Sequence, residues 1–217
     1  HVKLPIFVAR QWIRHRTANV NEYSGRYSIL DREFYLPSPD QLGEQSRSNR
    51  QGREAKLSPQ QAAQVLQLLR DDAERCYDHY EALLNEDESG AVKRPDDPQL
   101  ARELARMNLT LNYYTQWYWK IDLHNLLHFL ALRIDSHAQY EIRVYGDAIA
   151  RVVQAWVPTA WEAFVDYRLQ AALFSRAELA AIQARLRGES PDLAALGLSP
   201  REQREFEAKL AGSSLAP

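Results

Sequence analysis

The sequence predicts an α+β fold in which helices dominate, built as one mixed helix/sheet domain over residues 1–217. Long stretches after Ser58 and Asp122 repeat apolar residues at three- and four-residue spacing, which is typical of amphipathic helices. Two shorter stretches are rich in aromatic and β-branched residues, as strands are. A chain of 217 residues with 45% hydrophobic composition is also the right size to fill one core.

The N-terminal part predicts a strand that runs directly into a helix. Pro5 suits the first position of a helix from Ile6 to about Arg14, because its missing N–H is not needed there. Since the chain opens inside a structured element and without Met, we expect an N-terminal part of the domain to precede it. Arg26–Leu36 is predicted as a strand that a Pro-Ser-Pro sequence closes. The polar composition of residues 38–57 predicts a long loop, which we expect to be mobile over about residues 41–57.

Ser58 and Pro59 begin the clearest predicted helix, which should fade near Glu86 and end by Gly90. Its apolar stripe comprises Ala62, Val65, Leu66, Leu69, Ala73, Cys76, Tyr77, Tyr80, Leu83 and Leu84. A second helix is predicted from Asp97, as its N-cap, to about Met107.

The C-terminal half predicts one strand followed by helices. Asn112–Ile121 contains four aromatic residues and is predicted as a strand. Asp122 should cap a helix to about Arg133, and Ser136 should begin another that reaches Trp156. Residues from about 172 to 217 are predicted as a helical C-terminal extension, whose second short helix opens with a capping box.

The overall charge and the single cysteine limit the possible partners. A formal net charge of −2 gives no field for nucleic acid or an anionic membrane surface. No stretch approaches the roughly 20 apolar residues of a membrane-spanning helix. Cys76 alone excludes an internal disulfide and fits a reducing cytoplasm. We therefore expect a cytoplasmic protein without nucleic-acid or membrane partners.

One segment gathers groups that can bind phosphate. On a helix ending near Arg16, the side chains of Gln11, Arg14 and His15 share a face. Adjacent cations repel one another unless an anion lies among them. Ser24, Gly25 and Arg26 then add a hydroxyl, a free backbone N–H and a guanidinium. A solvated helix end with cations near its C-terminus explains the same spacing, so the pattern alone leaves both interpretations open.

Arg14-His15-Arg16, followed after seven residues by Ser24, resembles the signature of the flavin-dependent thymidylate synthases. The similarity covers most of residues 1–165, through Pro5–Arg16, Asn21–Tyr27, Phe34–Pro39 and Leu111–Tyr145. The resemblance implies an enzyme that makes dTMP from dUMP with FAD, NADPH and 5,10-methylenetetrahydrofolate. It also implies a homotetramer that binds FAD between subunits and has its active sites at subunit interfaces.

The resemblance also implies which residues bind the ligands. The implied FAD contacts are Arg14, His15, Arg16, Glu22, Asp122, His124 and His128. The implied dUMP contacts are Gln11, Arg14, Glu22, Tyr23, Ser24, Gly25, Arg26, Arg106 and Arg133. Arg106 would reach the nucleotide from another subunit. Arg133 is the implied catalytic residue, because activation of uracil C5 without a covalent adduct builds negative charge on N3 and O2. Without the resemblance, both arginines would be interpreted as ordinary surface or helix-terminal cations.

Three positions depart from the family pattern. Many members carry Asn, Arg and Asn where this chain has Asp122, His124 and His128. We expect His128, and secondarily His124, to hydrogen-bond the cofactor, and His137 to pack near it. These departures leave open a non-catalytic flavin- or nucleotide-binding protein of the same fold.

The two histidines of α-helical spacing also suggest a rival, a His-based metal hydrolase with Asp122 or Glu141 as third ligand. The glutamate that follows the first histidine in zinc hydrolases is missing, so we expect no metal. Cys76 lies on the apolar stripe of its helix, so we expect it to be buried and unreactive. Ser24 is assigned to phosphate binding rather than to nucleophilic attack.

Overall fold

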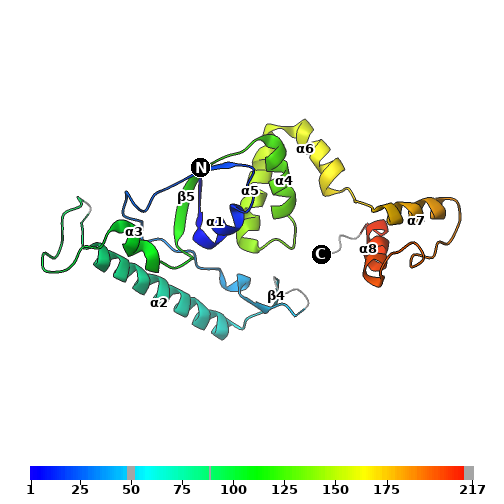
Figure 1. Cartoon of the computed structure of the whole chain (residues 1–217). Helices are drawn as coiled ribbons and strands as arrows, with labels where there is room; N and C mark the ends of the chain where they lie inside the picture. The colour runs from blue at the N-terminus through cyan, green and yellow to red at the C-terminus, as the bar shows by residue number, and fades with distance from the viewer. Residues whose placement is uncertain (48–51, 88, 213–217) are drawn as a thin grey trace. The chain divides into compact units, whose positions relative to one another are not determined.

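A computed structural model describes residues 1–47, 52–87 and 89–212 (Figure 1). The chain divides into two compact units, His1–Ala150 and Arg151–Pro217. The first unit contains all the residues that the sequence singles out for function, and it combines two small antiparallel sheets with helices. The mixed α+β fold is therefore as predicted.

The main sheet of the first unit has three antiparallel strands in the order β1-β5-β2. Its central strand is β5 (Tyr114–Lys120), within the predicted strand Asn112–Ile121. β1 (Val2–Pro5) and β2 (Asn19–Glu22) pair with β5 on either side, with Leu4 opposite Thr115 and Glu22 opposite Trp117. This register fixes where the chain leaves β2 and enters the Ser24 segment.

Three helices pack with this sheet around an aromatic core. α1 (Ile6–Trp12), α4 (Leu123–Arg133) and α5 (Tyr140–Trp156) are drawn on the same side of β5 (Figure 1). The Trp12 ring is fully buried, stacked on Phe129 of α4 at 4.9 Å and edge-on to Trp117 of β5 at 5.9 Å. Such contacts join burial with favourable ring geometry, so Trp12 holds α1 between the sheet and α4.

α2 (Pro59–Leu84) confirms the helix predicted from Ser58. Ser58 and Gln61 form a reciprocal capping box, and Asn85 ends the helix in the left-handed conformation with φ 48°. The buried side of α2 joins a second core cluster with the short helix α3 (Arg102–Ala105) and its 3-10 continuation η2 (Arg106–Asn108). The buried residues of this cluster are Tyr77, Tyr80, Leu84, Ala105 and Tyr113.

The predicted helix from Asp97 to Met107 is wrong in its first half. The Asp97 carboxylate pairs with Arg94 instead of capping a helix. The buried Asn85 side chain donates to the carbonyls of Arg94 and Asp97 at 2.8 and 3.0 Å. Residues 94–100 are thereby fixed in a non-helical path, and the helix begins only at Arg102.

The predicted strand Arg26–Leu36 is also wrong. Its one β-contact is an isolated bridge between Phe34 and Tyr113. The Leu30 N–H donates to the Tyr80 hydroxyl at 3.1 Å, and the Tyr77 hydroxyl donates to the Leu30 carbonyl. Because two side chains of α2 take the backbone groups that a neighbouring strand would use, the segment remains irregular.

Residues 38–57 form more structure than the continuous loop predicted. η1 (Pro39–Gln41) precedes an antiparallel pair, β3 (Gly43–Gln45) and β4 (Arg53–Lys56). Residues 48–51 of the predicted loop lie outside the described residues. Arg53 donates to the Gln41 carbonyl at 2.8 Å and to the buried Glu141 carboxylate at 2.6 and 2.7 Å. These contacts hold β4 against the N-terminal turn of α5.

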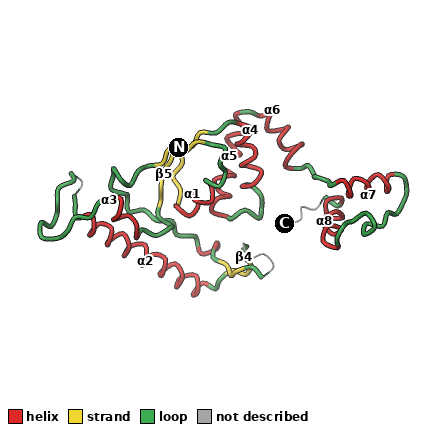
Figure 2. The backbone as a smooth tube through the Cα atoms, viewed as in Figure 1, coloured by secondary structure: helices red, strands yellow, loops and turns green. Residues whose placement is uncertain are grey.

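α5 starts at Tyr140 rather than at Ser136, because Asp135 accepts the His137 N–H at 2.8 Å and closes a turn there. The second unit continues with α6 (Pro158–Phe164), a π-helical turn (Val165–Leu169), α7 (Arg176–Leu186) and α8 (Pro200–Leu210) (Figure 2). Capping boxes open both α7 and α8, as predicted for the second. In the part of the chain that the structure describes, no helix combines the length and apolarity needed to cross a membrane.

Candidate active site

The Arg14-His15-Arg16 segment follows α1, which ends at Trp12, two residues before the predicted end at Arg14 and four before Arg16. The Trp12 ring is fully buried, whereas Arg14 and Arg16 are exposed. Neither arginine forms an ion pair with any described residue. His15 lies partly buried between them, with its Nε2 3.0 Å from the Thr17 hydroxyl. The segment therefore presents two free cations on either side of an imidazole.

His15 faces α4, with its ring centroid 5.6 Å from that of His128 and 5.5 Å from that of Phe129. Burial lowers the pKa of His15, and the nearby charges of His128 and Arg133 lower it further. Because its ordinary value is already below 7, His15 is neutral at pH 7. A neutral imidazole offers one hydrogen-bond donor and one acceptor.

Arg133, the last residue of α4, differs from Arg14 and Arg16 in its burial. Its side chain is partly buried, its guanidinium carbon lies 6.0 Å from the Phe129 ring centroid, and burial lowers its pKa. Its Nε is buried and has no hydrogen-bond partner among the described residues. An arginine remains charged at neutral pH even so. A buried, unsatisfied charged donor is costly, so this group fits a site that an acceptor fills.

Gly146 of α5 brings this helix close to Arg133. A Cβ added to Gly146 would lie 3.1 Å from the Arg133 carbonyl carbon and oxygen, and 3.2 Å from its Cβ. Any side chain at this position would push the two helices apart. The glycine therefore allows the close approach of α4 and α5 that sets the position of the Arg133 guanidinium.

The Glu22–Arg26 segment leaves the sheet in a tight turn. Glu22 accepts a hydrogen bond from the Thr115 hydroxyl at 2.6 Å, and Ser24 Oγ accepts the Arg26 N–H at 3.3 Å. Gly25 is buried, and a Cβ there would lie 3.0 Å from the Leu30 side chain. The turn thus leaves the Ser24 hydroxyl proton available, while Arg26 forms an exposed ion pair with Glu103 at 3.2 Å.

Asp122 and the remaining histidines occupy the two ends of α4. Asp122 caps the helix, accepting from the Asn125 N–H at 3.0 Å and from its side-chain amide at 2.6 Å. These hydrogen bonds lower the pKa of Asp122. Asp122 also lines an open cleft of about 460 Å³ with residues 17–19 and 120–121. His124 is exposed, and His137 pairs with Asp135 at 2.7 Å.

The structure gathers some of the sequence-predicted residues and separates others. His15, His128 and Arg133 lie together, and the buried Gln11 side-chain oxygen lacks a partner among the described residues. Arg106, on η2, is exposed and forms no ion pair with any residue that the structure describes. The nearby Glu103 carboxylate pairs with Arg26.

Two other groups named from the sequence are the possible metal ligands and Cys76. Glu141, considered as a metal ligand, is held by Arg53 at 2.6 Å. No group of three or more His, Cys, Asp or Glu side chains within residues 1–47, 52–87 and 89–212 is arranged to hold a metal ion. Cys76 is only partly buried, less than predicted.

Sequence reasoning missed the residues that support this site from a distance. Trp119 packs on Phe129 at 5.0 Å and lies 6.5 Å from His15, which extends the aromatic surface under the histidine. Arg102 binds Glu86 and the backbone of the Ser24 turn. No local pattern signals these contacts, because their partners lie far apart in the sequence.

Comparison with known proteins decides the family. The family model described as "Thymidylate synthase complementing protein" matches residues 1–159. A flavin-dependent thymidylate synthase of Gluconobacter oxydans (strain 621H) is 59% identical over 214 residues, covering 99% of this chain and 68% of the relative. This chain belongs to the flavin-dependent thymidylate synthase family. The predicted family resemblance is thereby confirmed, and with it a methyltransferase of dTMP synthesis that depends on flavin.

Two further relatives support the assignment. The flavin-dependent thymidylate synthase of Ruegeria pomeroyi (strain ATCC 700808 / DSM 15171 / DSS-3) is 57% identical over 207 residues, covering 95% of this chain and 66% of the relative. The chain therefore spans about two thirds of the length of these flavin-dependent thymidylate synthases. Among solved structures, a UMP/dUMP methylase PolB from Streptomyces cacaoi, bound with 5-Br UMP, has a TM-score of 0.64 and 29% identity. That similarity covers 76% of this chain and 70% of the methylase.

Proposed function

We propose that this flavin-dependent thymidylate synthase converts dUMP to dTMP with 5,10-methylenetetrahydrofolate as carbon donor and NADPH as reductant. The balanced reaction consumes dUMP, methylenetetrahydrofolate, NADPH and one proton, and it releases dTMP, tetrahydrofolate and NADP⁺. FAD, when bound, supplies the hydride-transfer chemistry. We further propose that the protein works in the cytoplasm as a homotetramer.

The observation that carries this proposal is the guanidinium of Arg133. It is partly buried, its Nε lacks an acceptor among the described residues, and the neutral ring of His15 lies nearby. Activation of uracil C5 requires a group that stabilises negative charge on N3 and O2 in the transition state. A guanidinium that cannot lose its proton meets that requirement.

The residues present fit a flavin dinucleotide. Arg14 and Arg16 are exposed cations without anionic partners among the described residues, so both are available to a diphosphate. His15 and His128 offer ring nitrogens side by side, with the His15 ring edge-on to Phe129. Glu22, Asp122 and His124 complete the proposed set of FAD contacts. Asp122 lines the open cleft beside its helix end, although both its oxygens already cap α4.

For dUMP, we propose that Ser24, Gly25 and Arg26 bind the phosphate. The compact turn leaves a hydroxyl proton and a guanidinium at its surface. Gln11, Glu22 and Tyr23 would contact the nucleoside, together with Arg14. Arg106 is exposed in the single chain, which supports its role at the nucleotide of a neighbouring subunit.

The test combines ligand binding with turnover in the full chain. Flavin absorbance and fluorescence are followed during an FAD titration with and without dUMP, and dTMP is quantified by mass spectrometry with NADPH and methylenetetrahydrofolate present. We expect saturable FAD binding, a spectral response to dUMP, and dTMP formation. Arg133→Lys, which keeps the charge but loses the planar fork, should lower kcat by at least roughly 100-fold. Arg187→Lys, in the second unit, is the matched control.

Other outcomes separate the alternatives. FAD and dUMP binding without dTMP formation would favour a non-catalytic binding protein, and stoichiometric metal without flavin would favour a hydrolase.

The sharing of sites between subunits is tested by mixing two variants that we expect to be inactive, Arg106→Met and Arg26→Met. If Arg106 acts on a neighbouring subunit, mixed oligomers contain sites with both arginines and regain activity. No recovery after subunit exchange would contradict that arrangement.

A further inference from the structure

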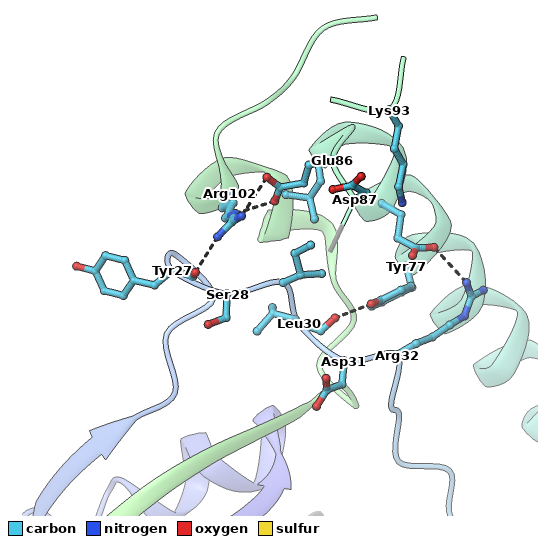
Figure 3. A pocket seen from close by; sticks show the side chains of 13 residues that line it. Tyr27, Ser28, Leu30, Asp31, Arg32, Tyr77, Glu86, Asp87, Lys93 and Arg102 are labelled. Atoms are coloured by element: carbon cyan, nitrogen blue, oxygen red, sulfur yellow. Dashed lines mark hydrogen bonds and ion pairs between the residues drawn. The ribbon is translucent and has the colours of Figure 1, made fainter. Parts of the chain in front are cut away.

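A partly buried ion pair lines an open cleft of about 610 Å³, together with residues 27–32 that follow the Ser24 turn (Figure 3). Arg102, the first residue of α3, donates from Nε and Nη2 to the two oxygens of Glu86, at 2.6 and 3.0 Å. The Glu86 side chain is 6% exposed and that of Arg102 is 30% exposed. The bidentate geometry fixes the orientation of the guanidinium as well as its position.

The same guanidinium makes a third contact, with the backbone that follows the proposed phosphate site. Its Nη1 donates to the Tyr27 carbonyl at 2.7 Å, as Figure 3 shows. The Tyr27 N–H in turn donates to the Ser24 carbonyl at 3.2 Å, which closes the turn. Arg102 therefore holds the residue at which the Ser24–Arg26 turn ends.

Other contacts hold the next part of the segment but leave this point to Arg102. Tyr77 and Tyr80 bind the backbone of Leu30, and the Leu30 side chain lies against Gly25. Arg26 pairs with Glu103, but that ion pair is exposed, and such pairs contribute little. Among the described residues, only Arg102 donates a side-chain hydrogen bond to the Tyr27 backbone.

We propose that Arg102, oriented by Glu86, is a positioning residue for the phosphate-binding turn Ser24–Arg26. This inference rests on the proposed function, because it assumes that the turn binds the dUMP phosphate. An arginine can give two parallel donors to the carboxylate and a third to the carbonyl, whereas a lysine lacks this planar fork. Such an ion pair is weak evidence for stability, so the proposal rests on the backbone contact that it orients, the hydrogen bond from Arg102 to the Tyr27 carbonyl.

The test separates positioning from stability by removing both charges together. Arg102→Met alone would leave Glu86 buried without a partner, which strongly destabilises proteins. The double variant Arg102→Met/Glu86→Gln avoids that buried charge but still removes the donor to Tyr27. Arg102→Lys is the second variant, since it keeps a cation beside Glu86. The matched control is Arg185→Met/Glu207→Gln, which removes a two-point Arg–Glu pair of the second unit.

We expect the double variant and Arg102→Lys to fold, to bind FAD as the parent does, and to raise the KM for dUMP roughly tenfold. At saturating dUMP, kcat should stay within about twofold, because the uracil contacts are intact. Affinity for deoxyuridine, which lacks the phosphate, should not change. The Arg185/Glu207 control should keep the parent KM for dUMP.

Folded variants with the parent KM for dUMP would overturn the proposal. Unfolding of both variants would also overturn it, because the pair would then serve the fold rather than the turn. Failure of the proposed function itself gives a different result, namely a parent protein that shows no response to dUMP at all.

Discussion

Gly146→Ala tests whether the contact between α4 and α5 sets the position of Arg133. In an ordinary helix this substitution stabilises by about 0.5–1 kcal/mol, because glycine loses more conformational freedom on folding. Here the added Cβ would meet the Arg133 carbonyl group at 3.1 Å and its Cβ at 3.2 Å. These atoms belong to the last turn of α4 and to the base of a side chain, so no flexible side-chain end can simply move aside.

The magnitudes decide the sign of the effect. Carbon atoms in favourable contact lie about 3.5–4.0 Å apart, so the two helices must separate by roughly 0.5 Å. Overpacking of this kind costs about 1–3 kcal/mol, which exceeds the gain in helix propensity. We therefore expect a net loss of about 1 kcal/mol in unfolding free energy. For a chain of this size that loss lowers Tm by roughly 2–4 °C.

The assay measures thermal unfolding and steady-state turnover of the same preparations. Displacement of Arg133 should lower kcat more than it raises the KM for dUMP, because the proposed contact strengthens in the transition state. Asp147→Ala, at the next position of α5, is the control that adds no Cβ beside Arg133. A Gly146→Ala protein with a higher Tm and unchanged kcat would refute the reasoning, since the helices would then absorb the methyl group without moving the arginine.

Two further predictions concern charged groups. Arg53→Met leaves the Glu141 carboxylate, 5% exposed, without its cation, so urea unfolding should show a loss of about 3 kcal/mol; a loss below about 0.5 kcal/mol would contradict this. Burial raises the pKa of Glu141, but hydrogen bonds from Arg53 and Gln139 outweigh it, and the net pKa is lowered. That stabilisation is present above the ordinary carboxyl pKa and is lost as pH falls through the lower folded value, so Arg53→Met should move the acid-unfolding midpoint to higher pH. The lowered pKa of His15 acts in the same direction, because the unfolded chain binds its proton first as pH falls below about 6.5. His15→Gln should therefore flatten the dependence of Tm on pH between about 5 and 7, and an unchanged slope would argue against a lowered pKa.

Elements with strong local signals could be predicted from the sequence. α2 and α4 combine apolar periodicity with a capping residue, Ser58 or Asp122, whose side chain accepts the expected backbone hydrogen bond. β5 carries a dense run of aromatic residues, and one of them, Trp117, is buried in the core. In these elements the local preference and the tertiary packing favour the same conformation.

The strand and helix predictions are wrong where a side chain from another element hydrogen-bonds the backbone. Leu30 lies in a segment with strand-like composition, but the hydroxyls of Tyr77 and Tyr80 bind its N–H and carbonyl. Asp97 is of a residue type favoured at N-caps, but the Asn85 side chain donates to its carbonyl and Arg94 pairs with its carboxylate. The contacts of Tyr77, Tyr80 and Asn85 cannot be recognised without knowing which residues α2 and its C-cap bring close, so local propensity gives the wrong answer there.

In the candidate site, too, the sequence motif predicts some features and only the tertiary structure shows others. The Arg14 to Ser24 motif predicts the family correctly and suggests the proposed phosphate turn. Arg14, Arg16 and Arg106 are nevertheless exposed cations, and an exposed arginine needs no partner. Arg133 differs, because its Nε is buried and lacks an acceptor among the described residues. Its position carries a structural argument for a ligand that does not depend on the family. We infer that the uracil is held against Arg133 within one chain, while the exposed arginines act where another subunit covers them. In the proposed arrangement α3 and η2 would serve two sites, since Arg102 would orient the chain's own Ser24 turn and Arg106, one turn later, would reach a neighbouring subunit.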